Sequence, residues 1–156
     1  MDGLVETLKG IAADVQADVI ADMVKEGAKP IVRSIRARVR VQDGNLKKSI
    51  VAVVRKRKRK GTAIAVIGPE SGGQYKGGKR LKKGHGQNDA AGPSRYAHLI
   101  EFGHVDRKGG RVKEFPFMRP GTAEGQATAS AMMEVGFQKG MNRVLAKRTK
   151  KLLRQK

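Results

Sequence analysis

The chain has 156 residues, a mass of 16.9 kDa and, with 34 Lys and Arg against 14 Asp and Glu, a formal net charge of +20. This length fits a single domain with a short tail, and the absence of cysteine excludes a disulfide scaffold and any thiolate chemistry. No apolar run approaches the roughly 18 residues that span a bilayer, and the first residues lack a signal-peptide pattern, so we expect no membrane partner. A charge this positive favours a polyanionic partner, with nucleic acid the default.

The first predicted element is an amphipathic helix. Apolar side chains recur at steps of four and three, with most acidic side chains on the opposite face, at Leu4, Leu8, Ile11, Val15 and Val19. Gly27 and Pro30 interrupt this spacing, since proline cannot donate a backbone hydrogen bond. Apolar steps of four then continue to Val39, which predicts a kinked or two-part helix that ends before Gly44.

A basic β-hairpin is predicted over residues 48–68. Two runs rich in β-branched residues flank a turn that contains Gly61. The tip and its flanks carry six consecutive bases, Arg55, Lys56, Arg57, Lys58, Arg59 and Lys60. The glycine-rich residues 69–94 predict a long mobile loop, and loops of such length in a small domain are usually functional or disordered.

The second half is predicted to hold a short element and a long closing helix. Residues 96–102 form a strand or a short helix, and two prolines favour an extended chain over residues 115–120. A helix follows, with Thr122 as its N-cap and with an apolar face formed by Phe137, Met141, Val144 and Leu145. Gly136 and Gly140 mark either close packing against a neighbour or a break. We expect one domain over 1–145 and a basic helix end or tail over 146–156.

Three sequence motifs follow one another along the chain. The first opens the hairpin and reads Gly44-Asn45-Leu46-Lys47-Lys48-Ser49-Ile50. The second is central and reads Tyr96-Ala97-His98-Leu99-Ile100-Glu101-Phe102-Gly103. The third precedes the last helix and reads Phe115-Pro116-Phe117-Met118-Arg119-Pro120. With these motifs the chain resembles the gene-product-ten family of the lambdoid phage HK-ninety-seven, small neck and tail-completion proteins of long-tailed phages. The positions that carry the resemblance are Gly44, Leu46, Ser49, Tyr96, Ala97, Glu101, Phe102, Gly103, Phe115, Phe117 and Pro120.

The resemblance implies a structural α+β protein, in which a small, mainly antiparallel sheet with a long β-hairpin packs against an N-terminal and a C-terminal helix. It also implies a terminator-like homo-oligomeric ring, sixfold, at the head–tail junction of a virion assembled in the host cytoplasm. Its partners would be other neck, tail-tube or head-completion proteins and the DNA passing near the channel. Independently, a small chain with two long amphipathic helices and few aromatics benefits from burying apolar surface against copies of itself. The loop 69–94 and the six-residue basic run depart from the family pattern.

The two basic blocks allow more than one interpretation. The run from Arg55 to Lys60 lies near DNA, contacts an acidic protein surface or has no partner, and contacts to phosphates would not read the base sequence. The C-terminal block over 139–156 is either a second contact surface or a solvated helix face with a frayed end. Its candidate contact residues are Lys147, Arg148, Lys150 and Lys151.

No catalytic, cofactor or metal site is expected. His98, Glu101 and His104 are spaced by three and three, which fits no familiar closed metal site. No phosphate-binding glycine motif stands between a strand and a helix, and no nucleophile-and-base arrangement is recognisable. We expect Glu101 to be a structural hydrogen-bond acceptor, for an arginine of an adjacent subunit.

A second hypothesis is a standalone, sequence-independent basic nucleic-acid-binding protein. Exposed aromatic side chains interleaved with bases would support it, because bases stack on such rings. The four aromatic side chains in the motifs are instead expected to fill the core, namely Tyr96, Phe102, Phe115 and Phe117. Composition does not separate the two hypotheses, but the central and third motifs favour the structural subunit, since a simple nucleic-acid binder has no need of them.

Overall fold

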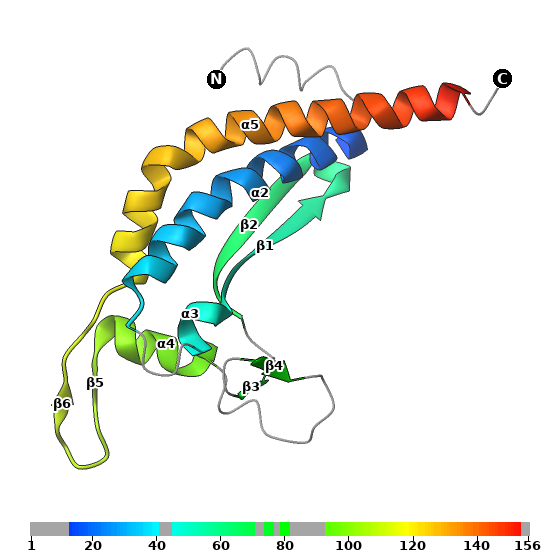
Figure 1. The fold of residues 1–156 in the computed structure, drawn as a ribbon. Helices are drawn as coiled ribbons and strands as arrows, with labels where there is room; N and C mark the ends of the chain where they lie inside the picture. Colours follow the sequence, from blue (N-terminus) through cyan, green and yellow to red (C-terminus); the bar gives the residue numbers. More distant parts are fainter. Residues whose placement is uncertain (1–12, 41–44, 71–73, 77–78, 82–92, 154–156) are drawn as a thin grey trace. The chain divides into compact units, whose positions relative to one another are not determined.

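The computed structural model describes residues 13–40, 45–70, 74–76, 79–81 and 93–153 (Figure 1). Leu4, Leu8, Ile11, Gly44 and most of the predicted loop 69–94 therefore lie outside the described residues. The fold is α+β, as predicted, with an N-terminal helix, an antiparallel hairpin and a C-terminal helix. Its contacts divide into two compact units, a first unit of residues 1–30, 53–66 and 128–156 and a second unit of residues 31–52 and 67–127.

Helix α2 runs from Ala13 to Arg38 without a break. The predicted two-part alternative is therefore wrong, because the loss of one backbone donor at Pro30 is tolerated within a helix that is well packed. Gly27 does not interrupt the helix but allows it to pack closely against the last helix of the chain, since a Cβ atom at Gly27 would lie 2.6 Å from Met133 Cγ. The helix ends before Gly44, as the sequence predicts.

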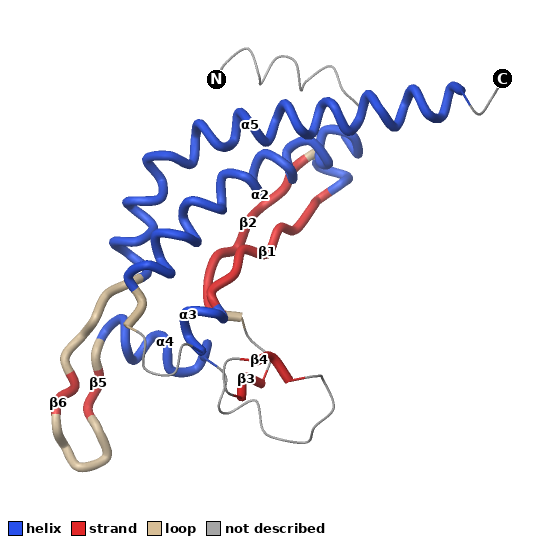
Figure 2. Tube along the Cα trace, viewed as in Figure 1, coloured by secondary structure: helices blue, strands red, loops and turns tan. Residues whose placement is uncertain are grey.

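The predicted hairpin is confirmed (Figure 2). The short helix α3, Asn45–Ser49, leads into strand β1, Ile50–Arg57, and strand β2 spans Thr62–Pro69. Between the strands, Lys58–Lys60 form a 3-10 turn. A hydrogen bond from the Gly61 N–H to the Lys58 carbonyl, 3.2 Å long, closes this turn. Gly61 has a φ of 59°, a left-handed conformation that glycine adopts without a steric cost.

Further short elements follow the hairpin. Strands β3, Gln74–Lys76, and β4, Lys79–Leu81, pair antiparallel. Of the two alternatives for residues 96–102, the helix is correct, because α4 spans Pro93–Phe102. Strands β5, His104–Val105, and β6, Arg111–Val112, then form a second short antiparallel pair with His104 opposite Val112.

The closing helix α5 spans Met118–Leu153. It begins four residues before the predicted N-cap Thr122, so the extended conformation expected up to Pro120 ends at Phe117. Pro120 lies in the first turn of α5, where the missing N–H would have no partner inside the helix. Gly136 and Gly140 do not break α5, which leaves close packing as the correct alternative. In the described part of the chain, no helix is apolar over enough length to cross a membrane.

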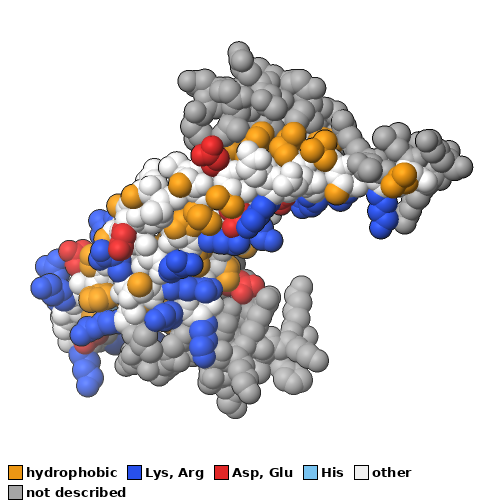
Figure 3. Space-filling model, turned by 45° about the horizontal axis from the view of Figure 1, so that its top comes forward, with side chains coloured by type: hydrophobic (Ala, Val, Ile, Leu, Met, Phe, Trp, Pro, Cys, Tyr) orange, Lys and Arg blue, Asp and Glu red, His pale blue; other side chains and the backbone are white. Residues whose placement is uncertain are grey.

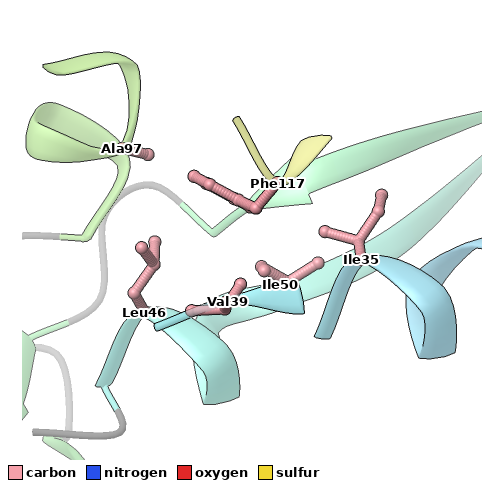
Figure 4. Packing of buried hydrophobic residues seen from close by; sticks show 6 residues of the cluster. All are labelled: Ile35, Val39, Leu46, Ile50, Ala97 and Phe117. Carbon is pink, nitrogen blue, oxygen red and sulfur yellow. The ribbon is translucent and has the colours of Figure 1, made fainter. Parts of the chain in front are cut away.

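Each unit has its own apolar core. In the second unit the buried side chains point toward one another from α2, α3, β1, α4 and the start of α5 (Figure 4), and they are Ile35, Val39, Leu46, Ile50, Ala97 and Phe117. In the first unit, Val19 of α2 and Phe137 of α5 are buried together, with Ile20, Met23, Met141 and Val144 packed around them. Leu145, predicted for the same apolar face, is 55% exposed.

The motif aromatics are divided between core and surface. Phe117 is fully buried and Tyr96 packs against the same core. Phe102 is 63% exposed and Phe115 is 37% exposed, so the prediction that all four fill the core is wrong for these two. Each exposed ring instead supports an arginine, with the Arg119 guanidinium carbon 5.0 Å from the Phe102 ring centre and that of Arg40 5.2 Å from Phe115.

Candidate functional site

The six bases at the end of the β1–β2 hairpin are all exposed, but they are not equivalent. Lys56 turns toward α2 and forms an ion pair with Asp18. This pair tethers the hairpin to the helix, and it lowers the pKa of the Asp18 carboxyl, chiefly through the hydrogen bond from Lys56. The other five bases form no ion pair with a described side chain. They are Arg55, Arg57, Lys58, Arg59 and Lys60.

The hairpin end is strongly positive, because its six bases follow one another with no acidic residue between them. Figure 3 shows that blue Lys and Arg side chains outnumber red Asp and Glu side chains on the visible face, where orange apolar side chains are also exposed. A surface of this kind attracts polyanions over distances of about one Debye length, roughly 10 Å at moderate salt. The hairpin end is therefore a candidate site for phosphates or for an acidic protein.

The stem of the hairpin shows a regular alternation. Along β1 the exposed positions include Val53, Arg55 and Arg57, and along β2 they include Thr62, Ile64 and Val66. The intervening residues Val54, Ala63 and Ala65 are half-buried. Because successive side chains of a strand point to opposite faces, the hairpin has one packed face and one open face.

The C-terminal basic block is engaged within the first unit. Lys139 Nζ lies 3.2 Å from a carboxylate oxygen of Glu26, and Arg143 lies 2.7 Å from Asp22. Arg143 also donates to the backbone carbonyl of Asp18 at 3.2 Å. A hydrogen bond from the neighbouring Lys29 and the contact with Lys139 together hold the pKa of Glu26 below its ordinary value, although burial acts in the opposite direction.

Sequence reasoning missed this pairing, although a signal for it was present. The acidic positions 14, 18, 22 and 26 are spaced by four, and so are the basic positions 139, 143 and 147. Spacing by four places residues on one helix face, so two helices with opposite charges at this spacing can pair along their length. Of the predicted contact residues, Lys147 and Lys150 are exposed, while the side chains of Arg148 and Lys151 lie outside the described part.

Glu101 of the central motif lies almost completely buried at the start of α5. Its carboxylate accepts hydrogen bonds from the backbone N–H groups of Phe117 at 2.7 Å, Met118 at 2.9 Å and Arg119 at 3.1 Å. The Arg119 side chain adds a fourth bond at 3.2 Å. The arginine partner thus comes from the same chain, and the expectation of an adjacent subunit's arginine is corrected, because the helix N-terminus offers the carboxylate closer donors.

Two opposing effects set the pKa of the Glu101 carboxyl. Burial by itself would raise the pKa of this carboxyl, but the three backbone donors and Arg119 favour the charged form more strongly. The net result is a pKa below the ordinary value. Glu101 is therefore a charged cap that joins the end of α4 to the beginning of α5.

The other motif residues mostly build the framework of the second unit. Ser49 is fully buried and donates its hydroxyl to the Leu46 carbonyl at 2.8 Å. Gly103 has a φ of 71°, and a Cβ atom there would lie 2.7 Å from the Val112 carbonyl oxygen, so only glycine fits this reversal. Leu46, Ala97 and Phe117 lie in the core, and Pro120 lies in the first turn of α5.

The geometry around His98 offers little to a metal ion. His98 is exposed, while the Glu101 carboxylate is occupied by the N-terminus of α5. Among the residues that the structure describes, no group of three His, Asp or Glu side chains is placed to hold a metal.

Comparison with known protein families assigns the chain to one of them. A family model described as "Bacteriophage HK97-gp10, putative tail-component" matches residues 2–103, well over half of the chain. The match includes α2, the hairpin and the central motif, and the chain belongs to this family of phage tail components. No curated protein and no solved structure matches the chain.

Proposed function

We propose that the protein is a non-catalytic, ring-forming subunit of the phage neck, a terminator-like component at the head–tail junction whose hairpin tip lies beside DNA. Membership of a tail-component family supports a structural role in the virion. The observation that carries the finer proposal is the hairpin tip, Lys58–Lys60, which is exposed and stands on a stem tethered to α2 through Lys56 and Asp18.

The charge distribution supports a role for this tip over Lys139 and Arg143 of the other basic block. Acidic side chains of α2 neutralise Lys139 and Arg143 of α5, whereas the tip bases have no described ion pair. A cluster of unpaired bases attracts phosphates without reading bases. Many such solvent-screened contacts would hold DNA near a channel while allowing it to slide.

The alternative is the standalone nucleic-acid-binding protein. The exposed rings of Phe102 and Phe115 favour it to some degree, since bases can stack on exposed aromatics near arginines. Each ring, however, already has an arginine over it. The two proposals differ in the expected assembly, because a ring subunit forms a closed oligomer and a standalone binder does not.

The assembly test uses the purified full chain. Light scattering and negative-stain images should show rings of one stoichiometry under the proposal. A protein that stays monomeric at all concentrations, binds duplex DNA tightly and loses affinity steeply with salt would favour the standalone binder instead.

The tip is tested by a triple change, Lys58→Ala, Arg59→Ala and Lys60→Ala. The matched control removes the same charge from another exposed turn, with Arg107→Ala, Lys108→Ala and Lys113→Ala. Both variants should form rings, but only the tip variant should lower the fraction of particles that are complete and retain DNA. For isolated protein, the slope of the salt dependence of duplex binding should fall by about 0.9 for each phosphate that the tip variant no longer neutralises. Normal particles with the tip variant would refute DNA binding by the tip.

A further inference from the structure

The open face of the hairpin stem carries apolar side chains as well as arginines. We call this the stem face and define it by Val53, Arg55, Arg57, Ile64 and Val66. Val53 is 47% exposed, Ile64 45% and Val66 53%. An isolated two-stranded hairpin is marginally stable in water, so a partner on this face would stabilise the hairpin as well as bury its apolar surface.

DNA does not account for the stem face. Phosphates can pair with Arg55 and Arg57, but they offer no apolar surface to the three β-branched side chains between and beside them. A protein surface with both apolar groups and a carboxylate fits better. The same face of a second copy fits less well, because the contact would then gather two arginines from each copy and no carboxylate, and like charges brought together at an interface repel one another.

The outer face of α5 has the complementary character. On the side toward α2, a Cβ atom at Gly136 would lie 2.6 Å from Met23 Cα, and Phe137 is buried. Ala131, Glu134 and Val135 lie about 100 to 200 degrees around the helix from Gly136 and are exposed. Val135 is 43% exposed, and the structure gives Glu134 no ion pair with a described side chain.

The stem face and the α5 face are two different surfaces of the first unit. The part of the hairpin that belongs to it is joined to α2 by Lys56 and Asp18, and Val19, the next residue of α2, packs against Phe137 of α5 (Figure 1). Lys56 and the half-buried Val54 are on the strand face toward α2, so the stem face is on the opposite face of the hairpin, just as the α5 face is turned away from α2. Two different, complementary faces on one unit produce a head-to-tail contact, which closes into a ring when the rotation from each copy to the next adds up to a full turn.

We infer that the stem face of one copy packs against Ala131, Glu134 and Val135 of the next copy. Arg55 and Arg57 flank the Glu134 carboxylate, and Val53, Ile64 and Val66 cover Val135. This inference rests on the proposed ring and names its subunit contact. The tip, Lys58–Lys60, lies beyond the stem face and stays free for DNA.

Cysteine cross-linking tests the contact directly, because the chain has no cysteine of its own. Chains with Ile64→Cys and chains with Val135→Cys are co-expressed, assembled and oxidised. A disulfide-linked dimer of the two different chains is expected, with neither variant cross-linking when it is expressed alone. The matched control pairs Val135→Cys with Val112→Cys, which is similarly exposed but lies in the second unit, and should give no dimer. Cross-linking of Ile64→Cys with itself would overturn the inference.

Charge reversal provides a second readout. Arg55→Glu and Glu134→Arg should each shift the ring toward the monomer mass, and the double variant should restore the ring. Lys58→Glu makes the same charge change on the tip and should leave the ring intact. Circular dichroism establishes that each variant is folded. If the unaltered protein forms rings and Arg55→Glu still does, the inference fails while the proposed function stands. If the unaltered protein never assembles, both fail.

Discussion

At the scale of single residues, Glu101 links the central motif to the architecture of the second unit. One carboxylate satisfies three of the backbone N–H groups that α5 leaves unpaired at its first turn. The negative charge also lies at the positive end of the helix macrodipole. This arrangement explains why α5 begins at Met118 and why the predicted N-cap Thr122 has no capping role.

We expect Glu101→Gln to lower the free energy of unfolding by about 2 kcal/mol, because the amide loses the charge and turns donors toward some of the backbone N–H groups. Urea denaturation at neutral pH measures this loss. Glu114→Gln serves as the control, since Glu114 is exposed and lies 3.9 Å from Arg119, and it should change the stability by less than about 0.5 kcal/mol. Equal stabilities of the two variants would contradict the capping role.

At the scale of secondary-structure elements, the first unit depends on the close approach of α2 and α5. Glycine at 136 and at 140 brings the two helix backbones together, since a Cβ atom at Gly140 would lie 3.0 Å from Val19 Cα. The same approach aligns Asp22 and Glu26 with the bases of α5. The close approach of α2 and α5 therefore accounts both for the packing between these helices and for the ion pairs between them.

Gly136→Ala should destabilise the protein by about 1–3 kcal/mol through overpacking, even though alanine favours a helix by about 1 kcal/mol over glycine. The reason is that the obstructing atoms belong to the Met23 and Asp22 backbone and cannot rotate away. Thermal or urea unfolding measures the change. Gly68→Ala is the control, since a Cβ atom there meets nothing within 4 Å and should cost little. Stabilisation by Gly136→Ala would show that the helices are not in close contact.

At the scale of the whole molecule, the large positive charge is partly compensated from within. Asp18, Glu26 and Glu101 all have pKa values held below their ordinary values by hydrogen bonds from bases or backbone donors, although burial opposes each shift. A carboxyl with a depressed folded-state pKa stabilises the fold above its unfolded-state pKa, and this stability is lost as the pH falls through the folded-state value.

Stability should therefore decline as the pH falls below the ordinary carboxyl values of 3.8 for Asp and 4.5 for Glu. The triple variant Asp18→Asn, Glu26→Gln and Glu101→Gln should be less stable at pH 7 and should lose less on going to pH 3. Urea midpoints across this range measure both effects. A pH dependence equal to that of the unaltered protein would show that these three carboxyls do not carry the acid sensitivity.

The sequence by itself determined the two long helices, the hairpin, the apolar stripes and the family, because each depends on spacing over a few residues or on a local motif, whereas it left residues 96–102 open between strand and helix. Only the tertiary structure decided which charged side chains form ion pairs with one another. The spacing by four shows that α2 and α5 each have a charged face, but it does not specify that these faces meet. In the structure Asp18 pairs with a base 38 positions away, and Asp22 and Glu26 pair with bases more than 100 positions away. For the same reason the arginine of Glu101 proved to be in the same chain, and Phe102 and Phe115 proved to lie at the surface, since burial depends on which segments pack together.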